Sequence, residues 1–239
     1  MIVLDSATAV VVCAGPSLDR LTPAAWSDLA QAGAIVSVNG AAASLACAAS
    51  GVRFTCLAAM DLSTGLATHV PPLTALWRDT TAWRVASTDS RGIDAESYIV
   101  EVDEEHGVEG WSDDRRQGYK GGSTGMVVGN WLGNAWPDDD LAQLQELEAR
   151  TGRTAPRRGF KRLAYVGLDM HRGHGVHARG AGNHTSGFAS SDTRYGNVCR
   201  GWEKFCNEAA RRGIEVVNCT PGTGLEAMPR ADVPEAWVS

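Results

Sequence analysis

The stretch VVCAGPSLD, residues 11–19, determines how the rest of the chain is interpreted. A run of β-forming residues stops at Gly15, Pro16 and Ser17, and a helix-like pattern follows. Continuous apolar runs bounded by turn residues are typical of buried parallel strands. Glycine permits positive φ and proline fixes the next φ, so these residues can turn the chain sharply. We expect the turn to direct free backbone N–H groups and a helix N-terminus at a phosphate, with Ser17 capping that helix.

The remaining chain alternates apolar, strand-like runs with helix-like segments. This alternation predicts an α/β, Rossmann-like fold with a mostly parallel sheet and helices on both faces. We interpret residues 1–239 as a single domain of this kind. The expected strands are residues 8–14, 34–38, 53–58, 82–86, 98–102, 162–166 and 214–217.

Polar or small residues follow several of these strands. Besides the Gly-Pro-Ser turn they are Asn39, Asp61, Asp169 and Asn218. Ligands of parallel sheets bind beyond the carboxyl ends of the strands, where such residues would meet. Turns are generally rich in glycine, asparagine and aspartate, so one such strand end indicates little, whereas five in succession favour a shared ligand site. Helix capping is the alternative role for each aspartate.

Composition narrows the class of protein. The net charge is −6, which argues against a long basic surface for duplex DNA. No apolar run approaches the ~20 residues that cross a bilayer, and no secretory signal opens the chain. Six scattered cysteines without a C-x-x-C pair indicate reduced, mostly buried thiols. We therefore expect a cytoplasmic protein without a membrane partner.

Residues 137–159 differ from their surroundings. They are polar throughout, acidic at the start and basic at the end. They lengthen a helix-to-strand connection that usually has about 2–6 residues. The segment therefore predicts an inserted polar helix or flap, solvated at the surface.

Six segments resemble, in order and spacing, the MptE-like family, which includes the archaeal 6-hydroxymethylpterin diphosphokinases. That family is similar to the bacterial family-42 sialyltransferases, and related uncharacterised proteins occur in Mu-like phages. The resemblance extends from Val10 to about Asp232 and leaves out residues 137–159. The segments are AGPSLDRL (14–21), VNGAAA (38–43), Asp61, KGGSTGMVVGNWLG (120–133), RLAYVGLDM (162–170) and VVNCTPGTGLEAMPRAD (216–232).

The resemblance implies roles for particular residues. In sialyltransferase-like members the Gly-Pro-Ser turn, the following asparagine and the Ser-Gly segment contact a nucleotide donor. In diphosphokinase-like members acidic strand-end residues help to hold magnesium, which makes Asp61 and Asp169 candidate Mg²⁺ ligands as well as donor contacts. The implied donor-binding residues are Gly15, Pro16, Ser17, Asn39, Asp61, Ser123, Thr124, Gly125 and Asp169.

Residues 170–190 are rich in histidine and glycine, include His171, His174, His177 and His184, and are expected to form a loop. An imidazole near its ordinary pKa can take a proton from an acceptor hydroxyl. The His-x2-His-x2-His spacing is no helical pair, and the glycines prevent a rigid geometry, so zinc is disfavoured. Sialyltransferase-like enzymes take a histidine base from this region, which makes His177 and His184 our candidates.

These observations predict a nucleotide-donor-dependent transferase, of glycosyltransferase type, that moves a sugar to a hydroxyl acceptor. The nucleotide or nucleotide sugar would be a co-substrate, with Mg²⁺ as the candidate cofactor. An ATP-dependent diphosphokinase-like transferase is one alternative. A non-catalytic nucleotide- or nucleic-acid-binding phage accessory protein is another. The acceptor would be a sugar, a pterin-like molecule or a modified DNA base. We expect the tryptophans to fill the core rather than to stack on a ligand.

Overall fold

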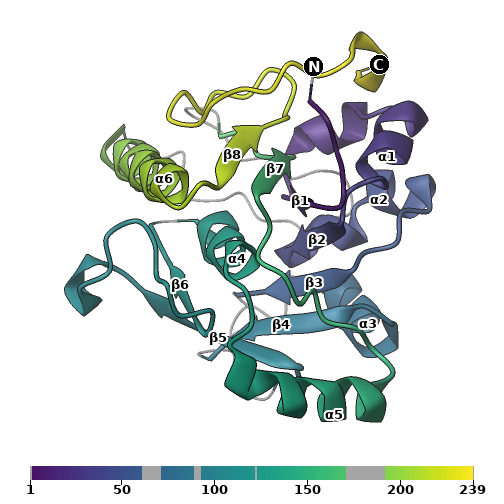
Figure 1. Cartoon of the computed structure of the whole chain (residues 1–239). Coiled ribbons are helices and arrows are strands. Elements are labelled where there is room, and N and C mark those ends of the chain that lie inside the picture. The colour runs from purple at the N-terminus through teal and green to yellow at the C-terminus, as the bar shows by residue number, and fades with distance from the viewer. Residues whose placement is uncertain (1, 61–70, 89–92, 122, 171–191, 239) are drawn as a thin grey trace.

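A computed structural model of the chain describes residues 2–60, 71–88, 93–121, 123–170 and 192–238. Within them, eight parallel strands form one sheet in the order β6-β5-β4-β3-β2-β1-β7-β8 (Figure 1). The predicted α/β, Rossmann-like fold is confirmed. The strands are β1 (Thr8–Val12), β2 (Ala34–Val38), β3 (Cys56–Ala59), β4 (Trp83–Ser87), β5 (Ser97–Val102), β6 (Gln117–Tyr119), β7 (Arg162–Val166) and β8 (Glu215–Asn218).

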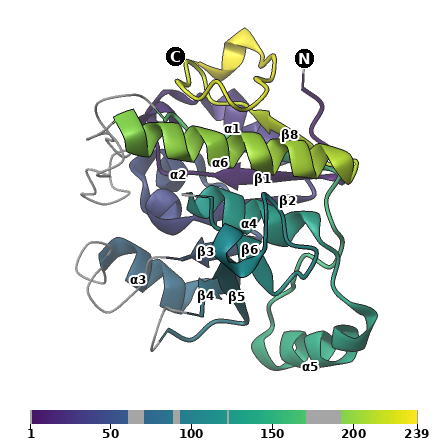
Figure 2. The same ribbon diagram turned by 90° about the vertical axis from the view of Figure 1, so that its left-hand side faces the viewer.

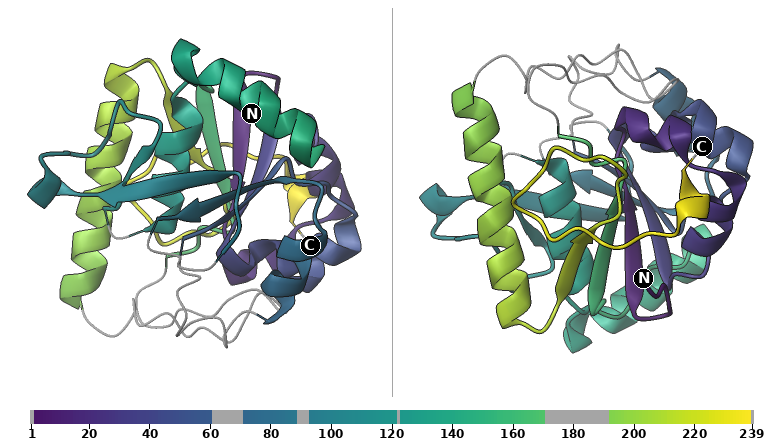
Figure 3. Two further views of the ribbon diagram at one scale, coloured as in Figure 1. Left: turned by 90° about the horizontal axis from the view of Figure 1, so that it is seen from below. Right: turned by 90° about the horizontal axis from the view of Figure 1, so that it is seen from above.

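Helices cover both faces of the sheet, as Figures 2 and 3 show. One face carries α1 (Pro23–Leu29), α2 (Leu45–Ser50) and α3 (Pro71–Asp79), and the other carries α4 (Thr124–Gly133) and α6 (Asp192–Arg211). Side chains alternate along each strand because successive residues of a strand point to opposite faces. Val10 accordingly packs with α1 and α2, whereas Val11 packs with α4.

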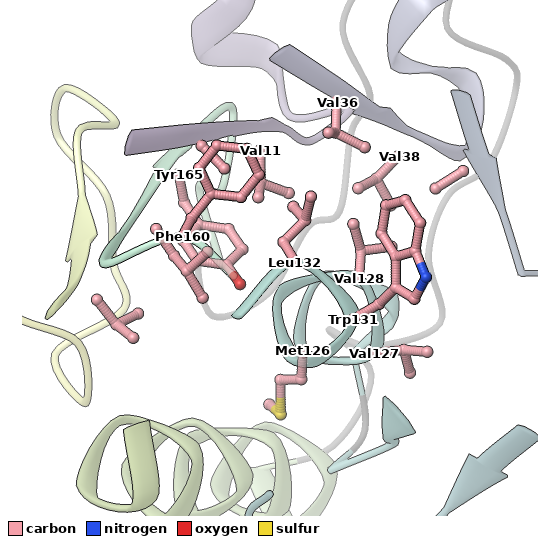
Figure 4. Close-up of a cluster of buried hydrophobic side chains, with 14 of the residues drawn as sticks. Val11, Val36, Val38, Met126, Val127, Val128, Trp131, Leu132, Phe160 and Tyr165 are labelled. Atoms are coloured by element: carbon pink, nitrogen blue, oxygen red, sulfur yellow. The ribbon is translucent and has the colours of Figure 1, made fainter. Parts of the chain in front are cut away.

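The centre of the larger core is α4, whose residues from Gly125 to Leu132 are all buried and, apart from Asn130, are apolar or glycine. Val127, Val128, Trp131 and Leu132 are buried on this helix (Figure 4). A helix that is hydrophobic all round is one that the fold encloses, here between the sheet and α6. Trp111 and Trp202 belong to the same core, so three of the tryptophans fill the interior as expected.

Two local predictions are corrected. The short strand β6 was not expected, because it contains no apolar run; its Gly118 allows close packing, since a Cβ there would lie 2.5 Å from Val127 Cγ1. The helix expected from residue 21 begins at Pro23. Thr22 caps it by accepting from the backbone N–H of Ala25 at 3.3 Å.

The expectation of a solvated excursion over residues 137–159 is also wrong in part. The segment contains α5 (Leu141–Thr151), which lies beside the β5 side of the sheet (Figure 1). Leu144 and Ala155 are buried in the main core. Arg153 Nη1 donates to the buried Glu96 Oε1 at 3.0 Å. The segment therefore is helical and polar outside but is anchored to the domain.

All six cysteines are free, and Cys13, Cys47, Cys56 and Cys219 are buried, which confirms the expected thiols. Burial, and after it the charge of Asp169, raise the pKa of the Cys13 thiol to about 12. None of the helices in the described ranges has the length and apolarity that a bilayer span needs.

Candidate functional site

The strand order reverses between β1 and β7. From β1 the chain builds outward through β2, β3, β4, β5 and β6, and it then returns to place β7 and β8 on the other side of β1. Such a reversal is a topological switch point, beyond whose strand ends open α/β sheets bind ligands. The Gly-Pro-Ser turn leaves β1 here, and Gly167 to Asp169 leave β7 here. Both predicted segments therefore lie at the one place that the topology favours.

The two strand ends are joined by the Ser17–Asp169 pair. Asp169 Oδ2 accepts from the Ser17 hydroxyl at 2.8 Å and from the Ser17 backbone N–H at 3.3 Å. The Gly15 N–H donates to the Gly167 carbonyl at 2.8 Å. Gly15 has no room for a side chain, because a Cβ would lie 2.0 Å from Asp169 Oδ2. These contacts lock the turn onto β7.

The way in which we expected this turn to work is corrected. The Ser17 N–H is donated to Asp169, and the Leu18 N–H is donated to the Gly15 carbonyl. Ser17 lies inside the 3-10 helix η1 (Pro16–Arg20) and does not cap it. The Asp169 carboxylate instead accepts from the Ser17 N–H in the first turn of this helix. A carboxylate thus occupies the place where an incoming phosphate was predicted. At Ser17 the turn therefore carries a carboxylate in place of the free N–H groups that would bind a phosphate.

Asn39 ties three neighbouring elements together. Its Oδ1 accepts from the Met60 N–H, at the end of β3, at 3.1 Å. Its Nδ2 donates to Thr124 Oγ1, at the start of α4, at 3.5 Å. Its φ is +50°, in the left-handed region that few residues other than glycine adopt. In the described ranges only Met170, with φ +46°, is another non-glycine residue of this kind, and it follows β7. Backbone strain is commonly stored at functional sites.

The N-terminus of α4 completes the same edge of the sheet. Ser123 Oγ accepts from the Gly125 N–H at 3.3 Å and caps the helix. The Tyr165 hydroxyl, buried on β7, donates to the Gly125 carbonyl at 3.0 Å. The first turn of a helix carries partial positive charge. We call Gly15, Ser17, Asn39, Thr124 and Asp169 the switch-point edge.

A network behind the switch-point edge was missed by sequence reasoning. Thr223 Oγ1 lies 2.8 Å from the Leu168 carbonyl and 3.0 Å from the Asp169 carbonyl, and Gly224 N–H donates to the Asp169 carbonyl at 2.7 Å. Asn218, expected to face a ligand, is buried and donates to the Leu168 carbonyl at 3.2 Å. These residues position Asp169. The turn composition after β8 was the only signal for them.

Some predicted residues cannot be placed. Asp61, His177 and His184 lie outside the described residues, so the histidine base and one of the two proposed magnesium ligands stay predictions. In the described part of the chain, no three His, Cys, Asp or Glu side chains come together as a metal site would require. Asp169 is the described carboxylate of the proposed magnesium pair, and its Oδ2 already accepts two hydrogen bonds.

Comparison with known proteins adds a likeness of fold. No protein-family model matches the chain, and no curated protein matches it. Among solved structures it is similar to one described as a MAf glycosyltransferase from Magnetospirillum magneticum AMB-1, with 12% identity and a TM-score of 0.47. The match covers 97% of this chain and 34% of that one, so this chain spans about a third of that protein's length. A likeness this distant carries no argument about activity.

Proposed function

We propose that the chain is a nucleotide-donor-dependent transferase of glycosyltransferase type, with its donor at the switch-point edge. One observation carries this proposal. The reversal of strand order coincides with the Ser17–Asp169 pair and with the strained Asn39 and Met170. Topology and local geometry thus favour the same place.

The charges at this edge suggest how a donor would lie. A phosphate beside Asp169 would meet like charge, whereas a ribose or sugar hydroxyl could donate to the carboxylate. The start of α4 favours negative charge, and Thr124 offers a hydroxyl there. The donor phosphate would therefore lie toward Thr124 and Asn39, with the hydroxyl-bearing part toward Asp169.

Sugar transfer on this arrangement requires a base. The acceptor oxygen would form a bond to the anomeric carbon while the bond from that carbon to the donor phosphate oxygen breaks. The nucleotide would leave with that electron pair, and the acceptor proton would pass to a histidine. His177 and His184 are the proposed bases, because they follow Asp169 and Met170 closely in the chain.

The test is a panel of ligands measured by thermal unfolding and calorimetry. CMP-, UDP-, GDP- and ADP-linked sugars are compared with ATP plus Mg²⁺. At a hundredfold excess over Kd, a bound donor stabilises the fold by about 2.7 kcal/mol. We expect stabilisation by at least one nucleotide sugar and none by ATP. The reverse would instead support diphosphate transfer, and no response to any nucleotide would contradict the proposal.

Asp169→Asn sharpens the same test. The amide keeps the shape and an oxygen that can accept from Ser17, but it removes the charge. We expect nucleotide-sugar affinity to fall at least tenfold, because the hydroxyl loses a charged acceptor, which is worth about 1.5–3 kcal/mol. Glu101→Gln is the matched control, since that carboxylate pairs with Lys120 beside β5. Equal losses in both variants would remove Asp169 from the donor site.

A further inference from the structure

Arg115 is a buried cation for which the described residues provide no anion. Only 2% of it is exposed. Its Nη2 donates to the Pro156 carbonyl at 2.8 Å, its Nη1 donates to the Asn134 carbonyl, and its Nε has no described hydrogen-bond partner. Burying a charge without a counter-ion costs several kcal/mol. Burial correspondingly lowers the pKa of Arg115 to about 9.

The neighbouring buried carboxylate of Glu96, by contrast, has cationic partners. The Glu96 side chain, 2% exposed, lies 2.6 Å from Arg84 Nη2 and 3.0 Å from Arg153 Nη1. Arg84 also pairs with Asp94 at 3.0 Å. Arg84 and Arg153 thus have carboxylate partners, whereas Arg115 has none among the described residues. The unbalanced positive charge belongs to Arg115.

Two indoles hold the Arg115 guanidinium in a fixed orientation. Its central carbon lies 4.3 Å from the ring centroid of Trp131 and 4.8 Å from that of Trp136. Cation–π contacts compensate part of the desolvation and restrict the side chain. Trp136 Nε1 donates to the Pro156 carbonyl that also accepts from Arg115. The cation is thus pre-organised, which lowers the cost of binding a partner.

A cavity of about 250 Å³ opens beside this group and is lined by residues from the start of β5 and from α5. Its inner wall includes the buried Arg115, Trp131 and Leu144, and its rim includes the exposed Tyr98 and Gln143. This volume is about that of eight molecules of liquid water. Since it adjoins the first residues of β5, this Arg115 pocket lies at the amino ends of the strands, opposite to the switch-point edge.

We propose that the Arg115 pocket binds a small organic monocarboxylate, with the carboxylate toward Arg115 and an aromatic or branched aliphatic body against Trp131 and Leu144. The walls combine aromatic and aliphatic side chains with polar ones, so that a ligand with an apolar body and a charged end fits them. Asp140 and Glu96 also line the cavity. They would repel a dianionic phosphate more strongly than a monocarboxylate, whose single charge can pair with Arg115, a cation without an anionic partner among the described residues. This site is separate from the proposed donor site.

The test uses benzoate and isovalerate as probes, with benzamide as the neutral isostere of benzoate. Binding is measured by calorimetry and by NMR of arginine Nε–H signals on the full chain. We expect one of the two carboxylates to bind and to shift the Arg115 Nε–H signal, and benzamide to bind at least tenfold more weakly. Binding of neither carboxylate, or equal binding of benzamide and benzoate, would overturn the proposal.

Variants locate the binding. Arg115→Lys should weaken carboxylate binding at least tenfold, because an ammonium cannot keep the stacked, planar geometry. Arg211→Gln is the control, since that exposed arginine of α6 pairs with Glu208 and does not line the cavity, and it should change affinity less than twofold. Gln143→Glu adds negative charge at the exposed rim without disturbing the fold and should weaken binding at least threefold. Unchanged affinity in both Arg115→Lys and Gln143→Glu would place the carboxylate elsewhere.

Discussion

Two buried charges, at opposite ends of the strands, are satisfied in different ways. Asp169 receives the N–H and the hydroxyl of Ser17, and so helps to join β1 to β7. Arg115 donates to two backbone carbonyls and lies against two indole rings, but it has no carboxylate partner among the described residues. The first charge serves the fold as well as the proposed donor site. The second leaves a positive charge that a ligand could balance. Substitutions on the Asp169 side should therefore affect both stability and donor binding, whereas substitution of Arg115 should chiefly affect the binding of a carboxylate.

The largest effect is expected at Gly15, on the Asp169 side of the comparison. Gly15→Ala would place a Cβ 2.0 Å from Asp169 Oδ2 and 2.3 Å from the Gly167 carbonyl. Relief requires the two strand ends to separate, so we expect unfolding free energy to fall by about 3 kcal/mol or more. Urea denaturation measures it.

Gly196→Ala is the control for Gly15. Gly196 lies in α6, where the nearest atom to an added Cβ is 3.7 Å away. The same substitution should there stabilise the fold by up to about 1 kcal/mol through helix propensity. Similar destabilisation by both variants would refute the locked turn.

The next effect is expected at Leu144, on the Arg115 side. Leu144→Ala removes a buried side chain that joins α5 to the core, and we expect a loss of about 3 kcal/mol. Leu45→Ala, at a side chain that is 60% exposed, should change stability by less than about 0.5 kcal/mol. A Leu144 variant as stable as the Leu45 variant would show that residues 137–159 are a solvated flap that does not pack on the core.

A smaller effect is expected from the Ser17–Asp169 hydrogen bonds themselves. Asp169→Ala leaves the Ser17 N–H without its acceptor and should cost about 2 kcal/mol. A double-mutant cycle with Ser17→Ala should give a coupling energy of about 1–2 kcal/mol. Additive losses would mean that the two side chains stabilise the fold independently.

The smallest effect is expected at Lys120, a basic residue that precedes α4. Its ammonium pairs with Glu101 Oε2 at 2.7 Å, and 57% of the side chain is exposed. Lys120→Gln should change stability by less than about 0.5 kcal/mol and leave nucleotide-sugar affinity within twofold. A tenfold loss of that affinity, measured by calorimetry, would move the donor phosphate from Asn39 and Thr124 toward β6.

The fold was largely predictable because its signals are local. The apolar runs at β1, β2 and β7 and the strand–helix alternation lie within short windows of sequence. β6 was not predictable, since Gln117–Tyr119 has no apolar run and pairs only because β5 and α4 flank it.

The candidate site was predictable in position but not in chemistry. Parallel strands place their carboxyl ends at one edge, so Ser17, Asn39 and Asp169 could be expected to meet. The Ser17 N–H donates to the carboxylate of a residue 152 positions later in the chain, and a local sequence pattern cannot predict such a contact. The contact of Thr223 with the Asp169 carbonyl was not predictable for the same reason.

Hydrogen–deuterium exchange with and without a bound nucleotide sugar tests the donor site most directly. We predict that the ligand slows exchange in the segments that form the switch-point edge, around residues 13–20, 39–43, 123–126 and 167–170, and leaves α5 unchanged. Protection confined to α5, with none around Ser17 and Asn39, would contradict the account.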